Sequence, residues 1–323
     1  MAESAKAGKG LADVVAASTA VSDIDGRAGV LSYRGYDIHD LANQITFEEC
    51  VHLLQRGTLP TRTQLDALNA ELAESRWLGD TVQAVLPEVA GKAAPMEALR
   101  TLVSALSPDD EDRGSNAPEA NQRKATRLVA QMPMLVASYH AARTGSSLPD
   151  PDPELGIAGN FLYQITGKRP GDEQVRYFDT CLVLHADHTM NASTFAARVC
   201  AATLSDMHSA VTAAIGTLKG PLHGGANEQV MRTLQSISGG PAVDTEVRAR
   251  LERGEKIMGF GHRVYRAEDP RATHLRRMSK RLAELSGDTT LYDMSARMEE
   301  TVRETKGLLP NVDFYAATVY HFL

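Results

Sequence analysis

Residues 172–218 read DEQVRYFDTCLVLHADHTMNASTFAARVCAATLSDMHSAVTAAIGTL, and this stretch decides the fold. Almost every window in it has apolar residues at i, i+3, i+4 and i+7, which is the spacing of one face of an α-helix. The opposite face is also rich in Ala, Val and Leu, so we expect these helices to be buried in a core or in a subunit interface. The stretch predicts an all-α protein.

The helical pattern continues on both sides of this stretch. Residues 46–49 (TFEE) and 61–64 (TRTQ) match the capping box that begins a helix, and Gly57 is placed to end the first of the two. Pro95 suits the first position of another helix. Further helices are expected near 226–238, 244–253, 271–286 and 289–305.

Three other parts of the chain have distinct patterns. Residues 119–143 predict one long helix, in which Pro133 removes an amide donor and should cause a kink over 129–133. Residues 11–38 mix short β-favouring runs with glycines and are the one place where we expect strands. Residues 1–10 are small and polar, which predicts a flexible tail.

The composition limits the possible functions. A length of 323 residues suggests about two domains, and 43% hydrophobic with 23% charged residues is ordinary for a globular protein. The net charge of −7 favours neither nucleic acid nor a membrane surface as a partner, so an anionic ligand needs a local group of cationic side chains. No apolar run could span a bilayer and the N-terminus has no signal-peptide core, which predicts a cytoplasmic protein. Cys50, Cys181 and Cys200 lie in apolar stretches without CxxC spacing and predict reduced thiols.

His223 lies in the segment GPLHGGANE, residues 220–228, where glycines allow a tight turn before a new helix. The positive end of that helix favours a neutral imidazole, which could donate a hydrogen bond to a developing oxyanion. A loop histidine that only caps the helix is the alternative.

A second segment, residues 258–266 (MGFGHRVYR), joins His262 to several arginines and is followed by Asp269-Pro270-Arg271. Histidine and arginines on a glycine-bearing loop before a helix suit the binding of phosphate or carboxylate. Gly259 and Gly261 are not a dinucleotide fingerprint, because the third glycine is missing. The alternative is a solvated basic loop.

Two more segments carry candidate groups. In HADHTMNAS, residues 185–193, His185 and His188 share a helix face beside Asp187, but no HExxH motif completes a metal site. Over a metal site, we favour a histidine that binds an organic acid, or one whose hydrogen bonds are made within the core. Asp313 lies between apolar residues in LLPNVDFY, residues 308–315, where a raised proton affinity suits a general base. A helix N-cap is the alternative role.

In their order along the chain, HADHTMNAS, GPLHGGANE, IMGFGHRVYRAEDPRA and LPNVDFYA resemble the signature blocks of the citrate synthase family, which includes 2-methylcitrate synthases. LSYRGYDI, residues 31–38, is similar to the N-terminal part of the shorter bacterial and archaeal members. The resemblance runs from about residue 11 to the end. It implies an almost all-helical homodimer, with a large domain over 11–223 that holds the dimer contacts and part of the keto-acid site. A small domain over 224–323 would hold the CoA site and the catalytic aspartate.

The resemblance also implies the reaction and the roles of the residues. Acetyl-CoA would join oxaloacetate, after which the citryl thioester is hydrolysed to citrate and CoA. Asp313 would take the proton from the acetyl methyl group, His223 would hydrogen-bond the thioester oxygen, and His262 would polarise the ketone. The implied oxaloacetate ligands are His188, Asn191 and Arg271. The implied CoA-binding residues are Lys256, Ile257, Gly259, Gly261 and Arg266. No metal or cofactor is implied, since the CoA thioester is a substrate.

The chain differs from the family pattern after Asp313. Family members continue for several helices that return to the large domain and carry an arginine for the keto acid, whereas this chain ends at Leu323. We therefore expect the C-terminal return to be missing and activity to be weak or absent. The remaining alternatives are a 2-methylcitrate synthase using propionyl-CoA, an inactive helical homologue with a binding or assembly role, and a metal-dependent hydrolase.

Overall fold

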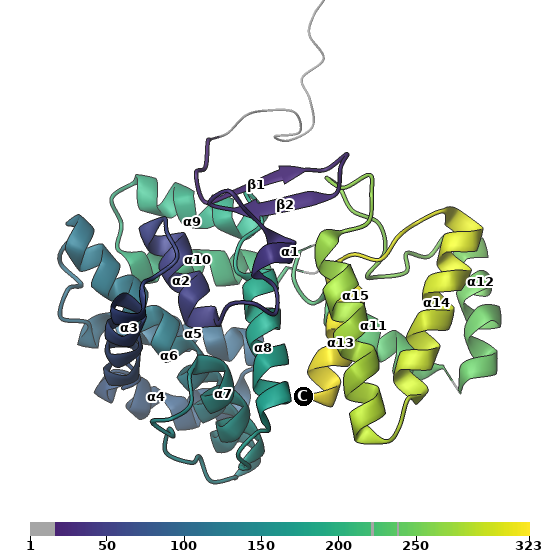
Figure 1. Ribbon diagram of the computed structural model, residues 1–323. Helices are drawn as coiled ribbons and strands as arrows, with labels where there is room; N and C mark the ends of the chain where they lie inside the picture. Colours follow the sequence, from purple (N-terminus) through teal and green to yellow (C-terminus); the bar gives the residue numbers. More distant parts are fainter. Residues whose placement is uncertain (1–16, 221–222, 238) are drawn as a thin grey trace, which may run out of the picture.

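A computed structural model describes residues 17–220, 223–237 and 239–323 of the chain. These residues form fifteen α-helices, two short 3₁₀ helices and one three-stranded sheet, which confirms the predicted all-α fold with short extended pieces near the N-terminus (Figure 1). The predicted tail, residues 1–10, lies outside the described residues, as does 221–222 of the His223 segment. None of the helices described is both long and apolar enough to cross a membrane.

The sheet is a small antiparallel meander that precedes the helices. It consists of β1 (Ser22–Asp25), β2 (Val30–Tyr33) and β3 (Tyr36–Asp37), in that spatial order. Ser22 pairs with Tyr33 at the open end of the β1–β2 hairpin, and Asp25 pairs with Val30 beside its turn. The strands β1 and β2 lie at the top centre of Figure 1, between the two groups of helices.

Ten helices precede His223 and lie mainly on one side of the molecule in Figure 1. They are α1 (Ile38–Leu41), α2 (Phe47–Arg56), α3 (Arg62–Glu74), α4 (Gly79–Lys92), α5 (Pro95–Leu106), α6 (Pro118–Thr144), α7 (Ile157–Thr166), α8 (Asp172–His185), α9 (Ala192–Ala202) and α10 (Met207–Leu218), with the 3₁₀ helix η1 (Ser107–Asp109) after α5. Both predicted capping boxes are present, and Gly57 ends α2 with a left-handed φ of 91°. Pro133 lies inside the continuous α6, where the kink stays a prediction.

Five helices follow His223 and lie on the other side. They are α11 (Ala226–Ser236), α12 (Val243–Glu252), α13 (Pro270–Ser286), α14 (Thr290–Lys306) and α15 (Val312–Phe322), with η2 (Gly240–Ala242) before α12. The bounds of α11 to α14 agree with the four expected helices to within two residues. The boundary between a large and a small domain at residue 223 stays a prediction.

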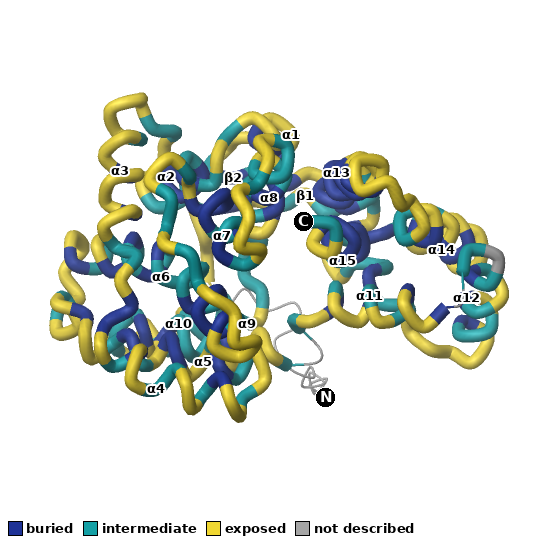
Figure 2. Tube along the Cα trace, turned by 90° about the horizontal axis from the view of Figure 1, so that it is seen from below, coloured by how far each residue is buried: buried dark blue, intermediate teal, exposed yellow. Residues whose placement is uncertain are grey.

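One hydrophobic core joins the two sides. It gathers buried side chains from the sheet, α1, α2 and α8 together with those of α11 to α15. In Figure 2 the traces of α13 and α15 are largely buried. Helix α9 differs, because none of its residues is buried although its sequence is mostly apolar. The prediction that the core of this chain buries α9 is therefore wrong. The alternative prediction, that a subunit interface buries this helix, stays open.

Candidate active site

Two of the predicted histidines meet at the junction of the two sides. His188 lies between α8 and α9, and His262 lies in the loop before α13, yet their ring centroids are 5.2 Å apart. The Tyr265 hydroxyl is 3.2 Å from His188 Nε2 and links the rings further. Burial, helped by the charges of Arg271 and His262, lowers the pKa of His188 to about 3. His188 is therefore neutral at pH 7.

The loop backbone fixes the tautomer of His262. Its Nδ1 accepts hydrogen bonds from the backbone N–H groups of Val264 at 3.0 Å and Tyr265 at 3.2 Å. A ring nitrogen that accepts such bonds carries no proton, so the proton of the neutral ring is on Nε2. Burial lowers the pKa of His262 and favours this neutral form. His262 is thus a neutral donor.

Arg271, in the first turn of α13, is held by a buried carboxylate. Its Nε and Nη2 donate to Asp269 at 2.9 and 2.8 Å, which leaves Nη1 without a hydrogen bond among the described residues. The two side chains are only 5% and 1% exposed. Asp269 Oδ2 also accepts the backbone N–H of Val312, the first residue of α15, at 3.1 Å. One carboxylate therefore positions both Arg271 and the start of α15.

Asp313 is the second residue of that helix. Its backbone N–H is bound by the Asn311 side chain at 3.0 Å, whereas its own carboxylate accepts no hydrogen bond from the described residues. Asn311 also donates to the carbonyl of Gly261 at 2.9 Å, which ties the start of α15 to the loop of His262. Burial raises the pKa of Asp313, although Arg271 acts in the opposite direction. This unpartnered carboxylate has the raised proton affinity that was predicted.

His223 lies in a separate group of contacts. Its Nε2 accepts the backbone N–H of Ser193 at 3.2 Å and is 2.9 Å from the Ser193 hydroxyl. Asn191 caps α9 by accepting the backbone N–H of Thr194, and it also accepts from the Ser193 hydroxyl. A neutral His223 therefore has its proton on Nδ1. Across the described ranges, His223 makes no hydrogen bond to His262 or Asp313.

The predicted CoA-binding residues lie along one segment. Lys256 and Arg266 are exposed, and neither forms an ion pair with the residues described. Ile257 packs partly buried against the main core. Gly259 has a φ of 86°, and a Cβ there would approach Phe314 and Val230 to 2.9 Å; Gly261 has a φ of 74°. Both glycines thus have a conformational role of their own.

The structure separates the three residues that suggested a metal. His185 turns to its own helix, with Nδ1 2.8 Å from the Cys181 carbonyl oxygen. Asp187 accepts the Ser22 hydroxyl of β1 and the Thr189 N–H. Within the described ranges, no group of three or more His, Cys, Asp or Glu side chains is placed to hold a metal ion.

Sequence reasoning missed the residues that connect these groups. Ser193, Tyr265 and Asp269 lie in the four candidate segments, but their partners could not be predicted. Ser193 bonds to His223, and Tyr265 to His188, across long stretches of chain. Asp269 bonds to its close neighbour Arg271, and residue spacing does not show that contact. The Asp-Pro-Arg order was the one available signal for Asp269, because Asp often caps a helix that has Pro at its first position.

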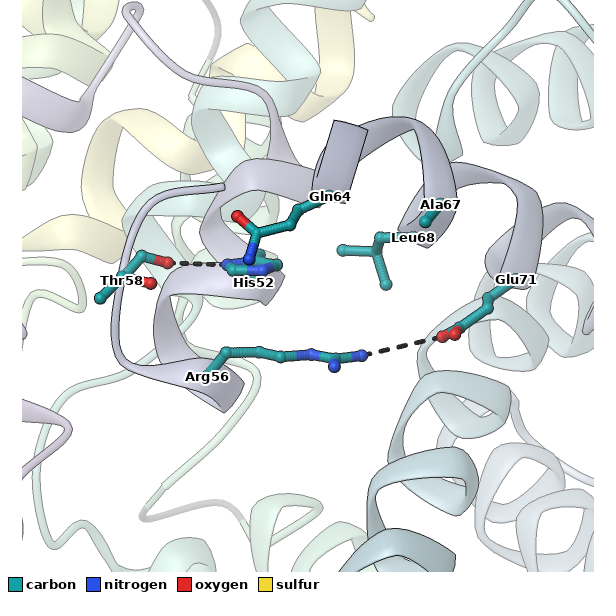
Figure 3. A pocket seen from close by; sticks show the side chains of 7 residues that line it. All are labelled: His52, Arg56, Thr58, Gln64, Ala67, Leu68 and Glu71. Carbon is teal, nitrogen blue, oxygen red and sulfur yellow. Dashed lines mark hydrogen bonds and ion pairs between the residues drawn. The ribbon is translucent and has the colours of Figure 1, made fainter. Parts of the chain in front are cut away.

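One cavity lies away from all of these residues. It has a volume of about 270 Å³ and is formed by α2, α3 and the connection between them. Figure 3 shows Arg56 directed at Glu71 and the His52 ring at the Thr58 carbonyl. None of the predicted site residues lines it. The candidate site is the junction of His188, His262, Arg271 and Asp313, whereas the described contacts of His223 are to Ser193.

This all-α fold combines neutral histidine donors, a buried arginine and an unpartnered carboxylate, which is a set of groups for acid–base chemistry on an anionic organic substrate. Residues 10–323 match the family model described as "Citrate synthase, C-terminal domain". Citrate synthase 2 of Bacillus subtilis is 48% identical over 98% of this chain and 84% of its own. The 2-methylcitrate synthase of Shewanella oneidensis is 40% identical over 98% and 84%.

Solved structures agree with these sequences. The citrate synthase of Pyrobaculum aerophilum superposes with a TM-score of 0.91 at 39% identity, over 97% of this chain and 81% of that one. A ternary complex of Thermoplasma acidophilum citrate synthase with carboxymethyl coenzyme A and oxaloacetate gives a TM-score of 0.86 at 27% identity, over 96% and 83%. The chain belongs to the citrate synthase family.

Proposed function

We propose that this chain is a transferase that condenses acetyl-CoA with oxaloacetate to give citrate and CoA. The observation that carries the proposal is the arrangement of His188, His262 and Arg271 around one junction, with the Asp313 carboxylate held beside it through Asp269. The family membership, and the carboxymethyl coenzyme A and oxaloacetate in the ternary complex of the Thermoplasma acidophilum citrate synthase, support the same reaction.

Oxaloacetate has two carboxylates and a ketone, and the junction offers a partner for each kind of group. Arg271 has Nη1 available to donate to a carboxylate, and Asp269 holds the guanidinium in place by accepting from Nε and Nη2. The Nε2 proton of His262 can be donated to the ketone oxygen, and His188 and Asn191 complete the proposed keto-acid site. Because both rings are neutral, they donate hydrogen bonds without adding positive charge beside the base.

The base acts on the acetyl group of the thioester. Asp313 takes a proton from the methyl carbon while the Nδ1–H of His223 donates a hydrogen bond to the thioester oxygen, where negative charge develops. The methyl carbon then bonds to the ketone carbon of oxaloacetate, the thioester carbonyl re-forms, and the ketone oxygen takes the Nε2 proton of His262. Water hydrolyses the citryl thioester to a carboxylate and the free thiol of CoA; the proton that this releases restores His262, and the proton on Asp313 passes to solvent. These steps use side chains of the protein only, and we propose that no metal or cofactor takes part.

We propose that CoA lies along residues 256–266. Lys256 and Arg266 are exposed cations suited to its phosphates. The backbone from Ile257 to Gly261 runs between them and turns sharply at the two positive-φ glycines. The large domain, 11–223, and the small domain, 224–323, would then meet at the substrates.

We further propose a homodimer that forms through α9 and α10. Helix α9 exposes Val199, Leu204 just beyond it is 81% exposed, and none of the residues of this mostly apolar helix is buried. Helix α9 packs along α10, whose sequence is also mostly apolar. A second copy of the same surface would cover these side chains. The buried free thiols Cys50 and Cys181 fit a reducing, cytoplasmic setting.

The test of the function is thiol release from acetyl-CoA in the presence of oxaloacetate. Asp313→Asn removes the base and should lower kcat by about 10²- to 10⁴-fold. Asp80→Asn is the matched control, because Asp80 also occupies the second position of a helix but is exposed. We expect thiol release from the wild-type chain to be weak. Its complete absence, or an Asp313→Asn variant with unchanged kcat, would contradict the proposal.

A further inference from the structure

The β1–β2 hairpin contacts both loops that carry the paired histidines, although no residue of the hairpin was among the predicted site residues. Its open end touches the segment of His188, between α8 and α9. Its turn touches the segment after His262, between α12 and α13. These two segments belong to different sides of the molecule, so a rigid hairpin that holds both could set the distance between the two rings.

Ser22 makes the contacts at the open end. Its hydroxyl donates to Asp187 and accepts the backbone N–H of Thr189 at 3.1 Å. Thr189 has a φ of 57°, a conformation that a β-branched residue adopts only when its surroundings enforce it. Tyr33, paired with Ser22 across the hairpin, is fully buried and accepts the Asp187 N–H at 3.2 Å. The backbone on both sides of His188 is therefore held by the hairpin.

Gly26 makes the closest contact at the turn. Its carbonyl accepts the backbone N–H of Arg266 at 2.7 Å, and a Cβ at this position would lie only 2.4 Å from the carbonyl oxygen of Val264. Asp25 stiffens the turn by accepting the N–H groups of Arg27 and Ala28, both at 2.9 Å. The turn thus rests directly on the backbone of residues 264–266.

That same backbone orients His262. The N–H groups of Val264 and Tyr265 bind His262 Nδ1, and the Tyr265 hydroxyl contacts His188. The contacts therefore form a closed ring that runs from His188 through Tyr265 to the turn of the hairpin, along the hairpin to Ser22, and back to the His188 segment.

We propose that the β1–β2 hairpin is a positioning element of the candidate active site, with Ser22 and Gly26 holding the His188 and His262 segments at a fixed separation. The proposal rests on the proposed function, since it assigns the hairpin a role in orienting the two keto-acid histidines. Neither Ser22 nor Gly26 reacts with substrate in this proposal.

Gly26→Ala tests the contact at the turn. The φ of Gly26 is outside the left-handed region, so alanine acts through its methyl group alone. The Val264 carbonyl must retreat by at least 0.6 Å to move from 2.4 Å to the 3.0 Å that real Cβ contacts require. Because a misplacement of about 1 Å can cost about 10²-fold, kcat/KM for oxaloacetate should fall by about 10- to 100-fold. Gly91→Ala, in α4 with open space around it, is the matched control and should leave kcat/KM unchanged.

Ser22→Ala tests the open end and should give a similar loss. Ser32→Ala is its control, because Ser32 lies on the facing strand and its hydroxyl makes no hydrogen bond among the described residues. A readout independent of turnover is amide hydrogen exchange of the ligand-free chain. Gly26→Ala should speed exchange not only at Val264 and Tyr265 but also at Thr189, on the far side of the ring, with exchange in α4 unchanged.

The outcomes separate this proposal from the proposed function. Unchanged exchange at Thr189 in Gly26→Ala would overturn the positioning role, whatever happens to kcat/KM. Faster exchange at Thr189 in a chain whose wild type shows no thiol release would uphold the hairpin as the link between the segments and reject the enzymatic proposal. Faster exchange at Thr189 with unchanged kcat/KM in an active enzyme would overturn the role in the site.

Discussion

The buried pair of Asp269 and Arg271 allows a sharp prediction about stability. Asp269→Asn keeps the shape of the side chain and an acceptor for the Val312 N–H, but it leaves the Arg271 charge buried without a counter-charge. Arg271→Met leaves the Asp269 charge in the same position. Removing one member of a buried ion pair costs about 3–5 kcal/mol, a large part of the 5–15 kcal/mol that stabilises a typical protein. We expect each single variant to lose about that much free energy of unfolding.

The double variant, Asp269→Asn with Arg271→Met, removes both charges together. Replacement of a whole buried ion pair by neutral groups is often close to neutral in stability, because the desolvation penalty of both charges disappears. We therefore expect the double variant to lose no more free energy than either single variant. The assay is urea unfolding followed by far-UV circular dichroism, with the midpoint and slope compared among the four proteins.

An exposed pair supplies the control for this cycle. Arg62 and Asp66 are separated by one helical turn, with side chains 85% and 56% exposed, so Arg62→Met and Asp66→Asn should each cost less than about 1 kcal/mol. Losses in the Asp269–Arg271 double variant that equal the sum of the two single losses would refute the reasoning. They would mean that the two buried charges do not stabilise each other.

Three further predictions concern pH, substrate and assembly. Burial, with His39 and Arg277 nearby, lowers the pKa of His274 from 6.5 to about 4, so between those pH values the unfolded chain binds a proton that the folded chain does not. Stability should fall as the pH falls through this window, and His274→Gln should flatten that part of a plot of Tm against pH; an unaltered slope would contradict the assignment. The ratio of kcat/KM for acetyl-CoA to that for propionyl-CoA should be about 10 to 200, because a pocket discriminates between substrates that differ by one methylene by about that factor. A higher kcat/KM for propionyl-CoA would identify a 2-methylcitrate synthase. Val199→Asp, at a side chain 51% exposed on α9, should convert a dimer to a monomer in sedimentation velocity, whereas a monomeric wild type would rule out the proposed interface.

Much of the fold was predictable because its signals are local. Capping boxes at Thr46 and Thr61, the proline at the start of α5 and the glycine after α2 are each read within a few residues, and the structure contains all of them. The exposure of α9 could not be read in this way. Its apolar residues look the same in sequence whether they face a core or a second subunit, and only the packing of the chain shows that its own core does not cover them.

For the site, the sequence by itself determined which chemical groups are present and their order, from His188 to Asp313. It also allowed the raised proton affinity of a carboxylate among apolar residues to be predicted, and burial does raise the pKa of Asp313. Only the tertiary structure decided which of these groups meet. His188 and His262 are joined through Tyr265, Asp269 connects Arg271 to the start of α15, and a hairpin near the N-terminus touches both histidine segments. Such contacts cross between segments far apart in the chain, and they depend on how whole helices pack, which no local pattern of residues records.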